Sequence, residues 1–120
     1  MKLYNTMSGK EESFAQKTHP VRMYVCGITP YAACHLGHAM SAITFDVLRR
    51  YLEFSGFEVI HVQNFTDIDD KIIDRSRELE ITTTELATSN TTDYLQALRA
   101  LNVLPATEYP RATSEMPNII

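Results

Sequence analysis

The sequence is poor in several features that would direct it to a particular class of protein. It has no tryptophan, only two cysteines, and no run of about 18 apolar residues that could span a membrane. The first residues lack the apolar core of a signal peptide, so the cytoplasm is the expected location. In such a chain Cys26 and Cys34 favour free thiols or metal ligands over a disulfide.

Positive charge is also scarce. The chain has 11 Lys and Arg residues against 15 Asp and Glu residues, which gives a net charge of −4 at pH 7. Binding to nucleic acid depends mainly on basic contacts to phosphates, so we do not expect these residues alone to hold RNA. The small basic clusters at Arg49-Arg50 and at Arg75 and Arg77 are expected to be solvated helix faces.

What the chain does contain fits part of an α/β domain. Its 120 residues suffice for one hydrophobic core, and 44% hydrophobic with 22% charged residues is ordinary for a globular protein. The pattern divides into a polar, irregular lead-in over residues 1–20, a βαβ unit over residues 21–66 and a helical segment over residues 67–120. The last segment stops soon after Pro117, as a truncated one would.

The βαβ unit follows from hydrophobic patterning. Residues 23–25 form an apolar strand, residues 39–54 have the period of an amphipathic helix, and residues 58–65 are apolar and rich in β-branched side chains. Such a unit makes a parallel pair, and ligands bind beyond the carboxyl ends of its strands. Residues 26–38 and 64–66 leave those ends, so the sequence predicts the site there. The helix is expected to turn four charged residues to solvent: Asp46, Arg49, Arg50 and Glu53.

Capping signals predict the helices of the last segment. Thr66 to Asp69 has the spacing of a capping box and precedes a helix that is expected to run to about Leu79. Thr82 to Glu85 is a second box, opening a helix whose apolar residues are Leu86, Leu95, Leu98 and Leu101. Pro117 fits the first turn of another helix, where proline is favoured.

A resemblance to a known family rests on the loop between the first strand and the helix. His35-Leu36-Gly37-His38 resembles the "HIGH" signature of class I aminoacyl-tRNA synthetases, and the preceding Cys26-Gly27 narrows it to the cysteinyl-tRNA synthetases. Three later segments are similar to the same family in the same order, so that the resemblance spans essentially all 120 residues. These segments are residues 45–52, residues 62–73 and residues 109–117.

The resemblance implies a fold, a reaction and partners. It implies the N-terminal portion of a Rossmann-like parallel sheet, the nucleotide-binding fold of class I synthetases. The family activates L-cysteine with ATP and Mg²⁺, releases pyrophosphate, and passes the cysteinyl group to tRNA(Cys); its members are mostly monomeric. The second signature of the family, a Lys-Met-Ser-Lys-Ser-type loop, is absent from these 120 residues. We therefore expect an N-terminal fragment that is inactive by itself.

The same resemblance implies the site residues. His35 and His38 would be catalytic, as hydrogen-bond donors to the phosphates of ATP, and Gly37 would let the nucleotide approach the backbone. Asn64 and Thr66 also have purely structural explanations, as a turn residue and as a helix N-cap respectively. Further contacts to the nucleotide would come from Thr29 and Ser41. The pocket for the aminoacyl-adenylate would include Gly27, Ile28, Asn64, Phe65 and Thr66, together with Cys26.

Cys26 is the predicted metal ligand. A thiolate is a soft ligand that suits Zn²⁺, and in the resembling family this cysteine is one of four zinc ligands around a metal that binds the thiol of the substrate. The other three ligands would lie beyond residue 120, so the chain is expected to be poor in metal. The alternative is a buried free cysteine. Cys34 is expected to be a small packing residue, and His19 and His61 to be structural.

Two other functions remain open. The cysteine-aminosugar ligase of mycothiol synthesis has a closely similar motif over residues 26–39, and Met40 departs from the arginine that commonly follows the synthetase motif. A non-catalytic adenine-nucleotide-binding module is a second possibility. The acidic run Asp67 to Asp70 is explained by the preference of helix N-termini for negative charge.

Overall fold

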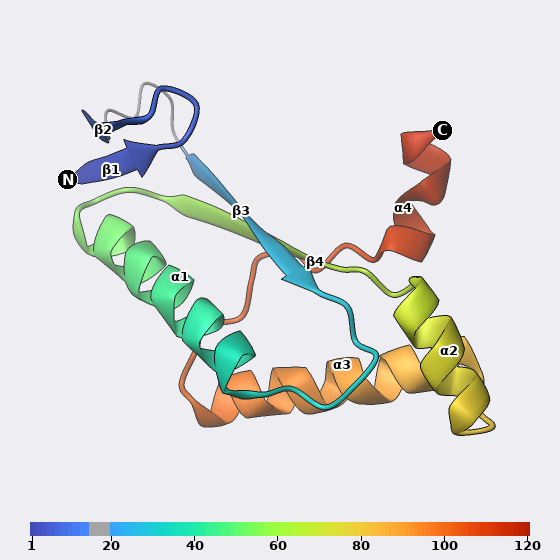
Figure 1. Cartoon of the computed structure of the whole chain (residues 1–120). Helices are drawn as coiled ribbons and strands as arrows, with labels where there is room; N and C mark the ends of the chain where they lie inside the picture. Colours follow the sequence, from blue (N-terminus) through green and yellow to red (C-terminus); the bar gives the residue numbers. More distant parts are fainter. Residues whose placement is uncertain (15–19) are drawn as a thin grey trace.

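The computed structural model describes residues 1–14 and 20–120, which form four strands and four helices (Figure 1). In chain order the strands and helices are β1 (Lys2–Asn5), β2 (Lys10–Ser13), β3 (Val21–Ile28), α1 (Leu36–Phe54), β4 (Val59–Phe65), α2 (Asp70–Glu78), α3 (Thr83–Ala100) and α4 (Ala112–Ile119).

The predicted parallel βαβ unit is confirmed. Strands β3 and β4 pair in parallel, with Val21 opposite Val59 and Val25 opposite Gln63. The register shifts after Val25, so that Ile28 lies opposite Phe65 at the carboxyl ends. Helix α1, which joins the two strands, begins at residue 36, three residues earlier than the hydrophobic period indicated. The loop before it crosses in front of α3 in Figure 1.

Within residues 1–14, the lead-in is not irregular. Strands β1 and β2 form an antiparallel hairpin, in which Lys2 pairs with Ser13 and Asn5 with Lys10. Gly9 has a φ of +67° in the turn, a conformation that suits glycine. The side chains of β2 are all exposed, so hydrophobic alternation could not reveal this strand. His19 lies outside the described residues.

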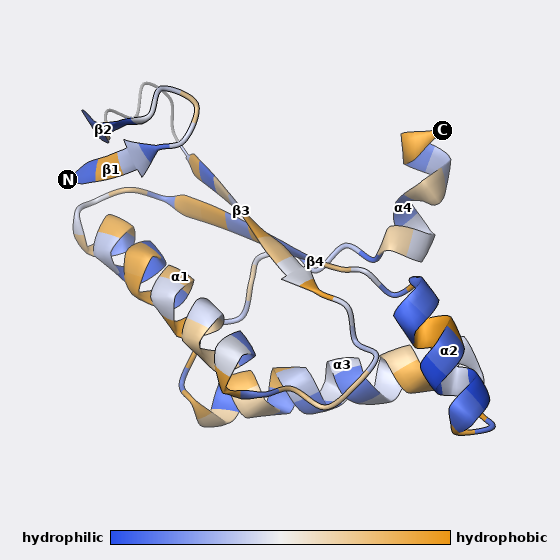
Figure 2. Cartoon of the chain, in the orientation of Figure 1, coloured by the Kyte–Doolittle hydropathy of each residue, from blue (hydrophilic) through white to orange (hydrophobic). Residues whose placement is uncertain are grey.

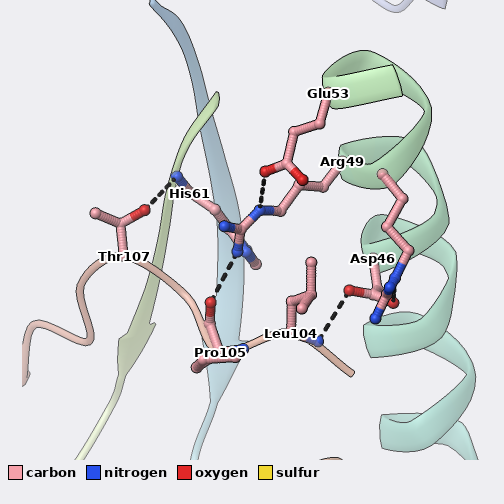
Figure 3. Close-up of polar contacts among 8 residues, drawn as sticks. Asp46, Arg49, Glu53, His61, Leu104, Pro105 and Thr107 are labelled. Atoms are coloured by element: carbon pink, nitrogen blue, oxygen red, sulfur yellow. Dashed lines mark hydrogen bonds and ion pairs between the residues drawn. The ribbon is translucent and has the colours of Figure 1, made fainter. Parts of the chain in front are cut away.

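The charged residues of α1 do not simply face solvent. Asp46 is only 8% exposed, and its carboxylate accepts hydrogen bonds from Arg50 Nε at 2.7 Å and from the backbone N–H of Leu104 at 3.0 Å. Arg49 donates through Nη1 to the carbonyl oxygen of Pro105 at 2.8 Å (Figure 3). These side chains therefore fasten the segment after α3, residues 102–105, against α1. Only part of the predicted charged face is exposed.

The same segment continues along the outer edge of β4. The backbone N–H of His61 donates to Thr107 Oγ1 at 3.0 Å, and Thr107 N–H donates to the carbonyl oxygen of His61 at 2.7 Å. Parallel bridges then join Val62 to Glu108 and Phe65 to Arg111. Residues 107–111 thus lie beside β4 like a short third strand.

Two of the predicted helix starts need correction. The N-cap of α2 is Asp69, whose side chain accepts from the N–H of Lys71, so the box that began at Thr66 is wrong. The box at the start of α3 is confirmed, because Thr82 and Glu85 bond each other in both directions. Pro117 lies inside α4 rather than in its first turn.

The buried face of α3 also differs from the predicted one. Leu98 and Leu86 are buried as expected, but Leu95 is half-buried and Leu101 is exposed beyond the end of the helix. The face is instead completed by Ala87, Thr91 and Tyr94. Spacing of leucines alone therefore placed the face a fraction of a turn away from its true position.

Among residues 1–14 and 20–120, the hydrophobic core is divided into three small clusters rather than gathered in one. One joins α1, β4 and α3, a second lies at the start of β3 and β4, and a third lies between α2 and α3. In Figure 2 the two parallel strands are largely hydrophobic, whereas α2 is mostly hydrophilic. Among the described residues, none of the helices is both long and apolar enough to cross a bilayer.

Candidate active site

The predicted site residues converge at the carboxyl ends of β3 and β4 and at the N-terminus of α1. Cys26, Gly27 and Ile28 are the last residues of β3, and Asn64 and Phe65 end β4. The two strand ends are joined where the N–H of Thr66 donates to the carbonyl oxygen of Ile28 at 3.0 Å. From the end of β3 the chain continues to His35, the N-cap of α1. This placement agrees with the general position of ligands in open parallel sheets.

The two histidines form a stacked pair at the helix N-terminus. Nδ1 of His35 accepts from the N–H of Gly37 at 3.1 Å, and Nδ1 of His38 accepts from the N–H of His35 at 3.2 Å. Their ring centroids are 4.0 Å apart and their planes differ by 18°. Because each Nδ1 is an acceptor, each neutral ring carries its proton on Nε2. Among the described residues neither Nε2 has a hydrogen-bond partner, so both Nε2–H groups can donate to a ligand.

Burial and the neighbouring ring both act on His38. Desolvation lowers the pKa of His38, and the charge of a protonated His35 would lower that pKa further. The neutral ring is therefore favoured, which preserves the Nδ1 acceptor that holds the pair. The two donors lie at the N-terminus of α1, where the helix dipole also favours an anion.

Gly37 is required by the ring beside it. A Cβ at this position would lie 2.9 Å from Cε1 and 3.1 Å from Nδ1 of His35. Any larger residue would displace that imidazole from its stack. The structure thus gives Gly37 a role in shaping the histidine pair, in addition to the predicted approach of a nucleotide.

Asn64 ties the two strand ends together. Its Oδ1 accepts from the N–H of Gly27 at 2.8 Å and from the hydroxyl of Tyr24 at 2.9 Å, and its Nδ2 donates to Thr66 Oγ1 at 3.3 Å. Gly27 is needed for this closeness, because a Cβ there would lie 1.4 Å from the backbone oxygen of Asn64. Asn64 and Thr66 therefore shape the floor of the site, and Thr66 is not a helix cap.

A comparison with known protein families shows to which family the chain belongs. Residues 12–120 match the family described as tRNA synthetases class I (C) catalytic domain. The chain belongs to this family. One curated relative is the cysteine–tRNA ligase of Dehalococcoides mccartyi, which is 54% identical to this chain over 121 residues. The match covers 100% of the chain and 26% of that protein. The cysteine–tRNA ligase of Archaeoglobus fulgidus is 49% identical over 122 residues, covering 100% of the chain and 26% of that protein.

Solved structures show the fold. A methionyl-tRNA synthetase of Mycobacterium tuberculosis, bound by methionyl-adenylate, superposes with a TM-score of 0.73 and 23% identity, covering 78% of this chain and 18% of that one. This likeness confirms the Rossmann-like class I fold for the synthetase-family chain. The chain spans about a quarter of the length of the curated cysteine–tRNA ligases that it matches.

The remaining residues that were predicted to contact substrate differ in how exposed they are. Ser41 is exposed on α1, one turn beyond His38, and the carbonyl oxygen of Thr29 accepts from the N–H of Tyr31 at 2.9 Å in a tight turn. Phe65 has only 2% of its surface exposed, and its ring stacks on Tyr109 with centroids 5.5 Å apart. Its side chain therefore belongs to the core, and only its backbone faces the site region.

Cys26 is an exposed free thiol at the end of β3. Within residues 1–14 and 20–120 there is no group of three or more His, Cys, Asp or Glu side chains that could hold a metal ion. One thiolate does not fit a four-coordinate zinc site by itself, so the role of Cys26 as a zinc ligand stays a prediction. Cys34 is half-buried against the core cluster of Ala42 and Tyr94, as expected of a packing residue.

The acidic run after β4 serves two helices. Asp69 caps α2 and Asp70 lies in its first turn. Asp67 instead accepts from the N–H and the hydroxyl of Thr113, at 3.0 and 2.6 Å, in the first turn of α4. Helix N-termini therefore account for these carboxylates.

Two residues near the signature were missed by the sequence reasoning. Asn90 and Tyr94 of α3 contact the loop and the second histidine, although they lie more than 50 residues further along the chain. The only local signal was the spacing of Ala87, Thr91, Tyr94 and Leu98, which marks one helix face without saying what it meets.

Proposed function

We propose that this chain is the nucleotide-binding portion of a cysteine–tRNA ligase, which activates L-cysteine with ATP and transfers it to tRNA(Cys). The observation that carries the proposal is the stacked pair of His35 and His38, whose Nδ1 atoms are hydrogen-bond acceptors at the N-terminus of α1, while Cys26 is an exposed free thiol near the carboxyl end of β3. The names of the curated relatives support cysteine as the amino acid and tRNA as the acceptor.

The proposed chemistry is in-line displacement at the α-phosphorus of ATP. A carboxylate oxygen of cysteine forms a bond to this phosphorus, the bond to the bridging oxygen of the β-phosphate breaks, and pyrophosphate leaves with that electron pair. Negative charge on the α-phosphate oxygens grows in the transition state, and fixed donors aimed at growing charge lower the barrier. In this chain those donors are His35 and His38, at the positive end of the α1 dipole.

The strand ends would supply the binding surface. The backbone N–H of Gly27 donates to Oδ1 of Asn64 at 2.8 Å. This hydrogen bond would hold the backbone of Gly27 and Ile28 as a flat floor for the adenylate. Cys26 would be one ligand of a zinc ion that binds the thiol of the substrate, with the other ligands outside this chain. Mg²⁺ would accompany ATP. A cytoplasmic location and a monomeric whole enzyme belong to the same proposal.

The test is cysteine-dependent exchange of labelled pyrophosphate into ATP by a chimera. In it this chain replaces the segment that it matches in the Dehalococcoides mccartyi enzyme, which serves as the positive control. We expect the chimera to catalyse exchange, the chain alone to be inactive, and Cys26→Ser to abolish exchange in the chimera. Cys34→Ala is the matched control, because this half-buried cysteine has no proposed contact with substrate.

A folded chimera without exchange, beside an active parent enzyme, would contradict the proposal and leave the nucleotide-binding module. The acceptor is decided separately. Formation of cysteinyl-tRNA by the active chimera supports the ligase, whereas transfer of cysteine to an aminosugar without charging of tRNA would support the mycothiol enzyme.

A further inference from the structure

Helix α3 contacts the signature loop, residues 29–35, and also His38 in the first turn of α1. No sequence motif marks either contact. Nδ2 of Asn90 donates to the carbonyl oxygen of Pro30 at 3.1 Å, and the side chain of Pro30 is fully buried. Four residues further on, the ring of Tyr94 meets the ring of His38 edge-on, with centroids 6.3 Å apart and planes at 85°. Residues four apart lie on the same helix face, so one face of α3 supports both the loop and the histidine.

Tyr94 is itself held firmly. It is only 2% exposed, its hydroxyl accepts from Nε2 of Gln63 at 3.3 Å, and its ring packs edge-on against Phe65 with centroids 6.0 Å apart. Gln63 and Phe65 belong to β4, whose carboxyl end forms the floor of the site. A continuous series of contacts therefore runs from that strand through Tyr94 to the ring of His38.

His35 receives the same constraint indirectly. Its side chain is exposed, and its ring is held by the stack on His38 and by the bond from Gly37 N–H. A shift of the His38 ring would therefore shift both rings. The direction of both Nε2–H donors therefore depends on the His38 ring, which Tyr94 of α3 contacts edge-on.

We propose that Asn90 and Tyr94 are positioning residues, which fix the signature loop and the His38 ring so that both Nε2–H donors point at one anion. This inference rests on the proposed function of the histidine pair. Asn90 sets the path of the backbone at Pro30, and Tyr94 sets the plane of the His38 ring. Neither residue touches the phosphate itself.

The first test measures the imidazoles directly, by ¹H–¹⁵N correlation spectra of the ring nitrogens of this chain as pH is varied. In the parent we expect His38 in the Nε2–H form, with a pKa below that of a free imidazole because it is desolvated. In Tyr94→Leu, water gains access to the ring, so the pKa should rise toward its ordinary value and the tautomers should mix. Tyr94→Phe keeps the ring edge and should retain most of the parent behaviour.

Matched variants on α3 separate positioning from general stability. Asn90→Ala removes the bond to Pro30 and should change the spectrum of His38, whereas Ser89→Ala, at the exposed neighbouring position, should leave it unchanged. If Tyr94→Leu does not fold, Asn90→Ala decides the question. A folded Tyr94→Leu or Asn90→Ala chain with the parent titration and tautomer would overturn the proposal.

The second test uses the chimera described above. Because loss of positioning affects the transition state more than binding, we expect kcat for pyrophosphate exchange to fall by about 10- to 100-fold in Tyr94→Leu, with a smaller change in the KM for ATP. An active chimera whose kcat is unaffected by both Tyr94→Leu and Asn90→Ala would overturn the proposal. An inactive parent chimera would count against the proposed function only, and the imidazole titration would then decide the roles of Asn90 and Tyr94.

Discussion

At the scale of single residues, Gly27 and Gly37 show why two glycines of one site have different tasks. A Cβ on Gly27 would meet the backbone oxygen of Asn64 at 1.4 Å, and backbone cannot move without separating β3 from β4. We therefore expect Gly27→Ala to lower the free energy of unfolding by about 3 kcal/mol, the upper end of the usual cost of overpacking. Urea denaturation followed by circular dichroism measures this. A loss below about 0.5 kcal/mol, as for ordinary surface changes, would show that the strand ends can separate at little cost.

Gly37→Ala should act on the site and not on the fold. Its Cβ would meet only the imidazole of His35, which can rotate away, and alanine is a better helix former than glycine by about 1 kcal/mol. The chain should keep or gain stability, while the nuclear Overhauser contacts between the rings of His35 and His38 disappear. In the chimera the variant should lose exchange activity. Intact ring contacts in a fully stable Gly37→Ala chain would contradict this role.

At the scale of elements, His61 links β4 to the segment that Arg49 and Asp46 fasten to α1 (Figure 3). It is 7% exposed, and neither ring nitrogen has a hydrogen-bond partner among the described residues. A small cavity of about 10 Å³ lies beside it, lined in part by Asp46 and Gln63. Burial lowers the pKa of His61, Arg49 lowers it further, and Asp46 opposes them. The neutral ring is thus favoured in the folded state.

This pKa predicts how stability depends on pH. A histidine whose folded pKa lies below its unfolded value contributes stability above the unfolded pKa of about 6.5, which is lost as pH falls through the folded pKa. The free energy of unfolding should therefore fall as the pH drops below about 6.5, with His61 and His38 both contributing. His61→Phe should remove the contribution of His61 to this pH dependence. Because the variant also lacks the two unsatisfied ring nitrogens, its free energy of unfolding at pH 7 should be about 1–2 kcal/mol higher.

The control for His61 is His38→Asn, which should leave the contribution of His61 to the slope. Urea denaturation at a series of pH values measures both variants. An equal or steeper acid slope in His61→Phe would mean that His61 is protonated in the folded chain without cost, against the burial that the structure shows.

The elements that the sequence could predict are those with local signals. The capping box at Thr82 and the apolar runs of β3 and β4 each depend on residues that are neighbours in the sequence, and the structure confirms them. The buried role of Asp46 could not be predicted, because its partner Leu104 lies 58 positions away in an irregular segment. For the candidate site, the histidine motif predicts a strand-to-helix turn, and the structure has His35 and His38 at such a turn between β3 and α1. The support from Asn90 depends on tertiary packing that one sequence does not encode locally.

At the scale of the whole molecule, the outer face of α1 carries an exposed apolar stripe. It runs the length of the helix at intervals of three or four residues and consists of Leu36, Met40, Ile43, Val47, Tyr51 and Phe54. Phe54 is 89% exposed and Val47 is 60% exposed. Contiguous apolar surface of this kind drives association of soluble proteins. Parallel sheets are also normally covered on both faces, yet Tyr24 of β3 is 64% exposed.

We therefore expect the isolated chain to self-associate as its concentration rises, in sedimentation-velocity experiments. Replacing Val47 and Phe54 together by lysine should weaken association by about 3 kcal/mol, hence roughly 100-fold in concentration, because each buried side chain of this size contributes about 1.5–3 kcal/mol. Gln96→Lys on the exposed face of α3 is the control for added charge. A parent chain that stays monomeric throughout would contradict the prediction. A control as effective as the double variant would show that net charge and not the stripe governs association.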